Sequence, residues 1–150
     1  MAITPRNIAE ADAKAVSVLS EQLGYPISEE ETARRIALIR NSENDVAYVA
    51  VDDEKVIAWI HIFYTLRIEC EQYCEVGGLV TNEQYRGRGV GKILLEKARE
   101  WCKTKGCKRL VVRSNTKRID AHQFYQKQGF REIKQQKFFE LTIELKNRLR

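Results

Sequence analysis

The sequence has little of several features that define specialised protein classes. Its 150 residues include only 2 prolines and 4 cysteines, and no low-complexity stretch, linker or internal repeat occurs. No segment approaches the ~18 uncharged apolar residues that a membrane-spanning helix needs, and the N-terminus lacks the apolar core of a signal peptide. These absences exclude collagen, a coiled coil, a disulfide-rich miniprotein and a membrane protein. They predict a cytoplasmic protein whose cysteines are reduced thiols.

What the chain does contain is typical of a single globular domain. Hydrophobic residues make up 43% of it and charged residues 31%. A chain of this length can bury one core but is short for two, so we expect one domain over residues 1–150.

The two parts of the chain carry opposite charge. Residues 1–83 hold 7 Lys and Arg against 15 Asp and Glu, whereas residues 84–150 hold 19 against 6. A basic half suits an anionic ligand, and an acidic half suits a cationic one. A nucleic-acid binder would interleave its basic residues with exposed aromatics or present a reading helix. Here 12 basic residues instead surround a glycine cluster between residues 84 and 118, which favours a phosphate compound.

Hydrophobic periodicity predicts a mixed α/β sandwich. Ser28 and Glu31 have the spacing of a capping box at the start of a helix, and Gly24 and Gly129 mark helix ends. The turn at residues 52–54 joins two strands into a hairpin. The expected helices cover residues 8–23, 28–40, 89–105 and 119–128, and the expected strands cover residues 45–51, 56–64, 70–81, 109–113 and 138–145.

The most informative segment is the glycine-rich stretch of residues 84–92, which lies between an expected strand and an expected helix. Glycines let the backbone adopt positive φ and approach a ligand closely, and a helix start adds unsatisfied N–H donors. A dinucleotide fingerprint would need glycine at Lys92, and a P-loop would need glycine at Arg86. The spacing that fits is Arg-x-x-Gly-x-Gly, formed by Arg86, Gly89 and Gly91.

This spacing resembles the acyl-CoA-binding motif of the GNAT N-acetyltransferase superfamily. Downstream, Arg113-Ser114-Asn115, then residues 121–125 and Gly129-Phe130, are similar to the second cofactor-side segment of that family. The resemblance covers roughly residues 45–140. It implies a central mixed, mostly antiparallel sheet with a splayed strand pair, flanked by about four helices.

The resemblance also implies acetyl-CoA as cosubstrate and a set of cofactor-binding residues. Backbone N–H groups of the glycine turn would hold the CoA pyrophosphate, and the pantetheine arm would pair with the backbone of the preceding strand. Asn115 would contact the cofactor through its side-chain amide. The expected cofactor-binding residues are Leu79, Val80, Arg86, Gly87, Arg88, Gly89, Val90, Gly91 and Asn115.

Two residues are expected to carry the acid–base chemistry. An alkylammonium cannot attack a thioester until it loses a proton, so the site needs a base or a water chain to one. Glu75 is the candidate base, because it lies on the strand entering the split, four residues before Leu79, and resembles the carboxylate that several family members use there; Glu71 is the alternative. Strand alternation would put Glu69, Glu71 and Glu75 on one face, where they would attract a cationic acceptor. Tyr125 stands where the family places its tyrosine acid. A backbone N–H near Leu79 would donate a hydrogen bond to the oxyanion of the tetrahedral intermediate.

The remaining histidines and cysteines do not indicate any other chemistry. We expect His122 to orient or cap a neighbouring group rather than to catalyse. We expect His61 to be a sheet residue whose ring is hydrogen-bonded within the protein. The cysteines lack zinc-ligand spacing, so we expect no metal. No base is paired with a cysteine, which favours direct attack in a ternary complex over a ping-pong route.

The sequence thus predicts an N-acetyltransferase acting on a primary amine, with a small cationic acceptor such as an aminoglycoside, polyamine or amino-acid derivative. One alternative is a protein or peptide N-terminal acetyltransferase, and another is a basic nucleic-acid-binding or regulatory protein. The expected partner is a small-molecule amine, with no nucleic acid and no membrane. The resemblance also allows a homodimer.

Overall fold

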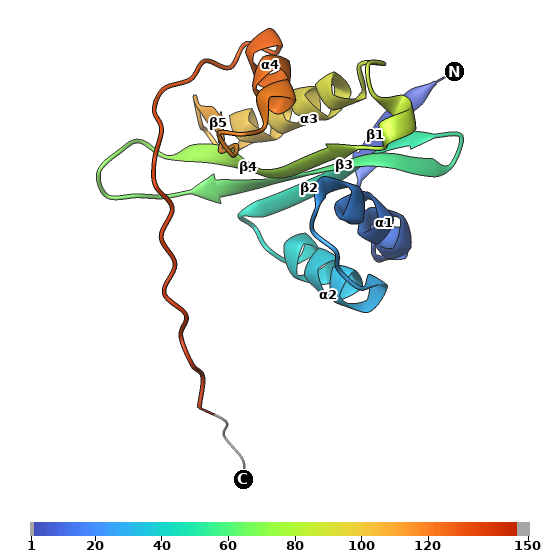
Figure 1. Ribbon diagram of the computed structural model, residues 1–150, viewed down its shortest axis with the longest axis horizontal. Coiled ribbons are helices and arrows are strands. Elements are labelled where there is room, and N and C mark those ends of the chain that lie inside the picture. The colour runs from blue at the N-terminus through green and yellow to red at the C-terminus, as the bar shows by residue number, and fades with distance from the viewer. Residues whose placement is uncertain (1, 147–150) are drawn as a thin grey trace.

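Five strands form one sheet in the order β1-β2-β3-β4-β5, and four α-helices cover its faces (Figure 1). The computed structural model describes residues 2–146. The strands are β1 (Ile3–Asn7), β2 (Asp45–Asp52), β3 (Lys55–Thr65), β4 (Tyr73–Thr81) and β5 (Leu110–Val112). The helices are α1 (Ala13–Leu23), α2 (Glu29–Arg40), α3 (Val90–Thr104) and α4 (Ile119–Lys127), with short 3-10 turns η1 (Glu10–Asp12) and η2 (Glu83–Tyr85).

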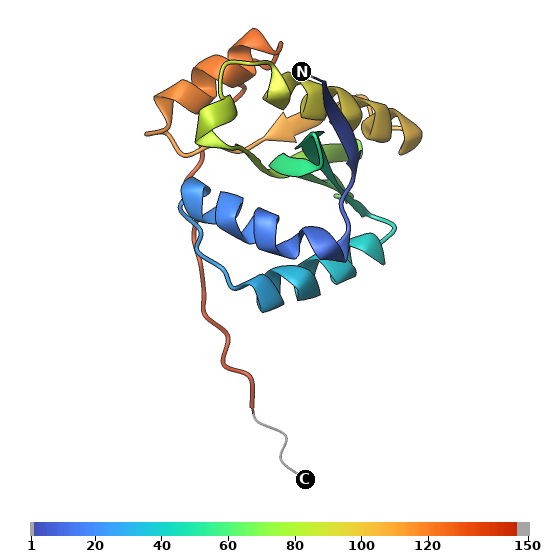
Figure 2. The ribbon, with the colours of Figure 1, turned by 90° about the vertical axis from the view of Figure 1, so that its right-hand side faces the viewer.

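The sheet separates two hydrophobic clusters. Helices α1 and α2 lie against one face, and α3 and α4 lie on the other (Figure 2). Alternate residues of β3 divide between the two faces: Ile60 and Ile62 are fully buried in the cluster on the α3 side, whereas Trp59 packs on the α1/α2 side. Strand alternation therefore places Trp59, His61 and Phe63 together on the α1/α2 face.

The predicted splayed strand pair is present. Strands β1 to β4 pair antiparallel, and β4 pairs with β5 in parallel over only three positions, from Cys74↔Leu110 to Val76↔Val112. Beyond Val76, β4 runs on to Thr81 while β5 has ended at Val112. One backbone edge of β4 is thus left without a strand partner over residues 77–81. The fold class predicted from the sequence is confirmed.

Most predicted elements are found within a few residues of their expected bounds. Ser28 caps α2, with its Oγ accepting from the N–H of Glu31 at 3.0 Å. Gly24 and Gly129 follow helices with φ of +98° each, as left-handed terminating residues do. The predicted hairpin turn is also confirmed, and Asp53 and Glu54 in it have positive φ. Local chemistry explains these successes, because each is decided by neighbours in the sequence.

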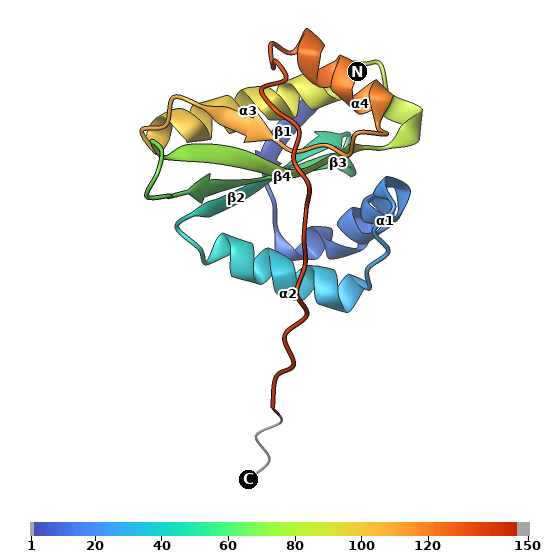
Figure 3. The same ribbon diagram turned by 60° about the vertical axis from the view of Figure 1, so that its left-hand side comes forward.

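One strand was not predicted, and two expectations are wrong. Residues 3–7, within which Pro5 lies, form β1, an edge strand antiparallel to β2. Residues 70–72 precede β4 as loop rather than extending it. Residues 138–145 form no strand; they are exposed and extended, and they leave the body of the protein (Figures 1 and 3). A strand pattern needs a neighbour to pair with, and none is present there in the described part of the chain.

An ion pair between exposed Arg6 and buried Asp12 fixes the entry to the first helix. Both terminal nitrogens of Arg6 on β1 donate to the two carboxylate oxygens of Asp12 at 2.8 Å, and the N–H of Ala9 donates to the same carboxylate. Burial opposes ionisation of Asp12, but the bonds from Arg6 and Ala9 outweigh it, so the pKa of Asp12 is lowered. The pair ties β1 to the segment leading into α1.

None of the helices within residues 2–146 is both long enough and apolar enough to cross a membrane.

Candidate active site

The glycine turn leads directly into helix α3, as predicted. Gly87 and Gly89 have φ of +79° and +78°, a conformation that other residues adopt only with strain. Gly91 is small for a different reason, because a Cβ there would lie 2.7 Å from the ring of Phe124 on α4. Gly87 and Gly89 therefore shape the bend, and Gly91 allows α4 to pack closely on α3.

The start of α3 presents unsatisfied amide donors. Its N-cap residue is Gly89, which has no side chain to accept a hydrogen bond, and the first intrahelical bond of the turn runs from Ile93 to Gly89. The N–H groups of Val90, Gly91 and Lys92 thus have no partner among the described residues. Together with the partial positive charge of a helix start, they form a site that suits phosphate oxygens.

Side chains that sequence reasoning missed hold this bend in place. The hydroxyl of Tyr85 donates to Asp52 on β2 at 2.7 Å, and that bond raises the pKa of Tyr85. The Arg88 guanidinium lies over the Tyr85 ring at 5.0 Å from its centroid. The turn is therefore anchored to the sheet. Asp52 and Tyr85 are 33 residues apart, a distance over which a local pattern gives no signal.

The predicted pantetheine strand has the open edge that its role requires. Leu79 and Val80 lie on β4 opposite Ile60 and Trp59 of β3, beyond the point where β5 ends. Alternate residues of a strand direct their backbone groups to opposite edges. One of these two residues consequently presents its N–H and C=O to the unpaired side of β4.

A bulge reshapes β4 immediately before that edge. The register with β3 shifts between His61 and Ile62, so that Gly77 is the extra residue. A Cβ on Gly77 would lie 2.9 Å from His61 Nδ1, and a Cβ on Gly78 would lie 2.7 Å from the Trp59 ring. The two glycines are required because rings from β3 fill the space above them on the α1/α2 face.

Glu75 is buried on β4 at the mouth of the splay. It is opposite Phe63, so its side chain lies on the same face as His61 and Phe63. Arg113, which follows β5, donates from Nε to Glu75 Oε2 at 2.9 Å. This bond raises the pKa of Arg113. The guanidinium compensates the burial of the carboxylate, and the sequence reasoning did not foresee it.

The expected row of three carboxylates does not form. Glu69 and Glu71 lie in the loop between β3 and β4, where both are exposed, and only Glu75 is in the strand. Alternation fails here because the strand begins at Tyr73. The alternative base Glu71 therefore does not share a strand face with Glu75.

His61 is a satisfied sheet residue, as expected, but it lies close to the site. Its Nε2 pairs with Asp45 Oδ1 on β2 at 2.7 Å. The other ring nitrogen, Nδ1, is directed at the Gly77 bulge. A second titratable pair therefore lies on the same face as Glu75.

Tyr125 on α4 lies between two aromatic rings. Its ring meets Phe124 and Phe130 edge to face, at 5.3 and 5.4 Å between centroids. Burial raises the pKa of Tyr125, so its hydroxyl keeps its proton at neutral pH. Phe124 packs against the α3-side core and over Gly91.

Asn115 organises the loop between β5 and α4. Its side-chain oxygen accepts from the N–H of Lys117 at 2.9 Å, which leaves the amide NH₂ as the group available to a ligand. The ring of His122 bonds the backbone oxygen of Asn115 at 2.8 Å. His122 thus has the orienting role that was expected of it.

The comparison with known families decides the classification. A sequence model described as the acetyltransferase (GNAT) family matches residues 14–130. The chain belongs to this family. This GNAT protein is therefore an acetyl-CoA-dependent N-acetyltransferase.

Individual relatives are distant in sequence but similar in fold. An aminoglycoside N(6')-acetyltransferase type 1 of Stenotrophomonas maltophilia is 24% identical over 145 residues, covering 94% of each chain. The crystal structure of an aminoglycoside 6'-N-acetyltransferase of Acinetobacter haemolyticus superposes with a TM-score of 0.82 at 20% identity, covering 96% of this chain and 100% of the other. Another aminoglycoside N-acetyltransferase, solved in complex with CoA, has a TM-score of 0.84 at 17% identity, covering 93% and 95% of the two chains.

Three cysteines of this GNAT protein meet in the core, which their sequence spacing did not indicate. The Cys74, Cys102 and Cys107 sulfur atoms lie within 4.8 Å of one another, and all three residues are buried. Burial raises the pKa of Cys74 and of Cys102. Both are neutral thiols packed between β4 and α3, and all four cysteines of the chain are free.

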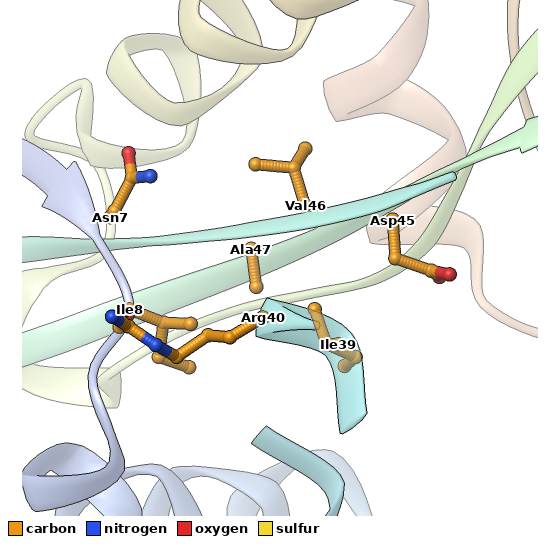
Figure 4. A pocket seen from close by; sticks show the side chains of 7 residues that line it. All are labelled: Asn7, Ile8, Ile39, Arg40, Asp45, Val46 and Ala47. Atoms are coloured by element: carbon orange, nitrogen blue, oxygen red, sulfur yellow. Dashed lines mark hydrogen bonds between the residues drawn. The ribbon is translucent and has the colours of Figure 1, made fainter. Parts of the chain in front are cut away.

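A cavity of about 250 Å³ lies on the β1–β2 side of the sheet (Figure 4). Arg40 at the end of α2 reaches into it and bonds the backbone oxygen of Ile8. Asp45, the partner of His61, lines its other end. None of the predicted cofactor residues lines this cavity.

Proposed function

We propose that this GNAT protein transfers an acetyl group directly from acetyl-CoA to the primary amine of a small cationic acceptor. The observation that carries the proposal is the position of Glu75, a buried carboxylate at the mouth of the β4–β5 splay, on the sheet face that α1 and α2 cover. A carboxylate there can attract a cation and take its proton.

The residues of the glycine turn fit the diphosphate of the cosubstrate. The N–H groups of Val90, Gly91 and Lys92 donate to its oxygens, and the bend at Gly87 and Gly89 lets the backbone approach them. The turn of residues 86–91 also brings the charges of Arg86 and Arg88. The open β4 edge at Leu79 and Val80 receives the extended pantetheine arm, and the amide of Asn115 donates to it. Acetyl-CoA supplies an activated thioester.

Glu75 accepts the proton of the acceptor amine. An alkylammonium has a pKa of about 10, so nearly all of the amine is protonated at neutral pH. It must lose this proton before it can attack. Arg113 bonds only Oε2 of Glu75, which leaves Oε1 to face the acceptor. Arg113 thereby holds the carboxylate in place while the proton is taken.

Tyr125 donates a proton to the departing sulfur. Its pKa is raised by burial, so it is a protonated donor throughout the physiological range. Thiols have pKa values of about 8.5, so the thiolate leaves readily and the donor has a modest effect. No covalent intermediate on the protein is needed, because the acceptor attacks directly.

A small polycationic amine is the acceptor that best fits these charges. The part of the chain that builds the α1/α2 face is acidic, since residues 1–83 contain 15 Asp and Glu against 7 Lys and Arg. Two of the similar proteins described above are aminoglycoside 6'-acetyltransferases by name. An aminoglycoside is accordingly the first acceptor to test.

The direct test is release of free CoA thiol, followed with DTNB, in the presence of acetyl-CoA and a panel of amines. The panel includes aminoglycosides, polyamines, amino-acid amides and short peptides with free N-termini. Turnover confined to small cationic amines supports the proposal. Turnover on peptides alone would replace it with N-terminal acetylation. Salt-dependent duplex binding without acetyl transfer would overturn it.

A further inference from the structure

Three buried cysteines form a cluster of thiols on the α3 side of the sheet. Cys74 lies on β4, Cys102 in the last turn of α3, and Cys107 in the segment that joins α3 to β5. Their three sulfur atoms lie within 4.8 Å of one another, and the residues are 0%, 4% and 7% exposed. Because the thiols come from three different segments, the fold and not a local motif brings them together.

The spacing of the sulfur atoms suits one ion that is bound by all three. Thiolate sulfurs lie about 2.3 Å from a bound ion such as zinc, so three of them around one centre are separated by about 4 Å. Since the sulfur atoms are already within 4.8 Å of one another, small side-chain movements are sufficient to reach this arrangement. A soft ion is favoured, because every ligand atom of the cluster is sulfur.

The cluster does not supply the ligands that a structural zinc ion takes. Zinc is almost always held by four ligands in a tetrahedron. Among residues 2–146, the group consists of three cysteines with no His, Asp or Glu. The thiols of Cys102 and Cys107 donate to the main-chain oxygens of Arg109 and Lys105. Three sulfur ligands without a fourth suit an ion that forms three bonds.

Charge decides which ion of that kind fits. Removing the proton of each thiol gives three negative charges among buried apolar side chains such as Ile62, Leu95 and Ala98. A buried charge is costly when no opposite charge compensates it. A monovalent ion would leave two negative charges in the core and a divalent ion one, whereas a trivalent ion leaves none. The core therefore favours a trivalent, thiol-seeking element that forms three bonds.

We propose that Cys74, Cys102 and Cys107 form a binding site for trivalent arsenic, which enters as arsenous acid. Arsenous acid, As(OH)3, is a neutral molecule at neutral pH. Three As–O bonds and three S–H bonds break, three As–S bonds form, and each departing hydroxide leaves with a thiol proton as water. Arsenic stays trivalent, so neither an oxidant nor a reductant is needed. The product is a neutral complex within an apolar core.

The proposed site is separate from the residues assigned to acetyl transfer. Cys74 packs in the α3-side core, whereas its neighbour Glu75 is directed at the opposite face of the sheet. None of the three cysteines belongs to the glycine turn or to the open edge of β4. The inference is therefore independent of the acceptor proposed above.

Equilibrium dialysis of the reduced full chain against sodium arsenite is the first test, with incubation long enough for the core to open locally. One arsenic per chain is expected. Cys102→Ala and Cys107→Ala should each weaken binding at least about tenfold, because losing even an outer partner of a metal ligand costs about 10- to 100-fold. Cys70→Ala, outside the cluster, is the matched control and should bind as the wild type does.

Three results of this experiment would overturn the proposal. They are no binding by the wild type, unchanged binding by either cluster variant, and an equal loss of binding by Cys70→Ala. Far-UV circular dichroism verifies that each variant is folded.

Native mass spectrometry of the wild-type protein tests the site without a variant. The mass should show one arsenic bound with three protons lost and no hydroxide retained. A retained hydroxide would show that fewer than three thiols bind, and would overturn the three-thiol site. The charge argument also predicts that equimolar zinc does not displace the arsenic. Displacement by zinc would overturn the assignment to a trivalent ion.

Discussion

The Nε of Arg113 lies 2.9 Å from Oε2 of Glu75 and joins the end of β5 to the mouth of the splay on β4. The two residues are 38 positions apart in the chain. A buried carboxylate without a counter-charge would be costly, and the guanidinium offsets that cost. The pair holds in place the carboxylate that we propose as the base, and the first prediction tests that role.

Glu75→Gln should lower kcat by about 100-fold or more, because the amide cannot accept the amine proton. Part of the loss should be recovered at high pH, where more of the amine is already neutral. The measurement is the pH profile of kcat with the best acceptor. Glu71→Gln, in the exposed loop, is the matched control and should behave as the wild type.

His61→Gln tests whether the His61–Asp45 pair, rather than Glu75, acts as the base. If Glu75 is the base, this variant should keep most of the wild-type kcat and its pH profile. A wild-type rate for Glu75→Gln together with a large loss for His61→Gln would assign the base to the His61–Asp45 pair instead.

Tyr125→Phe should lower kcat by about 10- to 100-fold, at or below the lower limit of the usual range for acid–base catalysis, because the thiolate is already a tolerable leaving group. Since burial raises the pKa of Tyr125, its phenol should ionise only above pH 10. Subtracting the ultraviolet titration of Tyr125→Phe from that of the wild type measures this ionisation. An unchanged kcat, or ionisation below pH 10, would contradict the assigned role.

Asp12→Asn should destabilise the fold at pH 7 by about 1–3 kcal/mol, because it removes a charge-assisted partner of Arg6. The pKa of Asp12 is lowered by folding, so its contribution is complete above the unfolded value of about 3.9 and is lost as the pH falls through the lower folded value. Urea unfolding of wild type and variant should thus differ at pH 7 and converge in strong acid. Asp53→Asn, in an exposed turn, should show no difference at either pH.

Local sequence patterns were sufficient for most elements and for the glycine turn. The cap at Ser28, the left-handed Gly24 and Gly129, and the bend at Gly87 and Gly89 all depend on immediate neighbours. These features could therefore be predicted with their approximate bounds.

Long-range partners could not be predicted from such patterns. The bonds of Glu75 to Arg113 and of Tyr85 to Asp52, and the meeting of three cysteines, depend on how the sheet brings distant segments together. The strand expected over residues 138–145 failed for the same reason. Its alternation is present, but a strand exists only where another backbone pairs with it.

The central claim is that the main-chain amides at the start of α3 bind the diphosphate of acetyl-CoA. Gly89→Asp places a carboxylate at this bend, and Gly89→Asn places a neutral side chain of the same shape there, which tolerates positive φ similarly. Calorimetric titration with acetyl-CoA is expected to show a dissociation constant raised at least about tenfold for Gly89→Asp relative to Gly89→Asn. Equal affinities for wild type, Gly89→Asn and a folded Gly89→Asp would contradict the account.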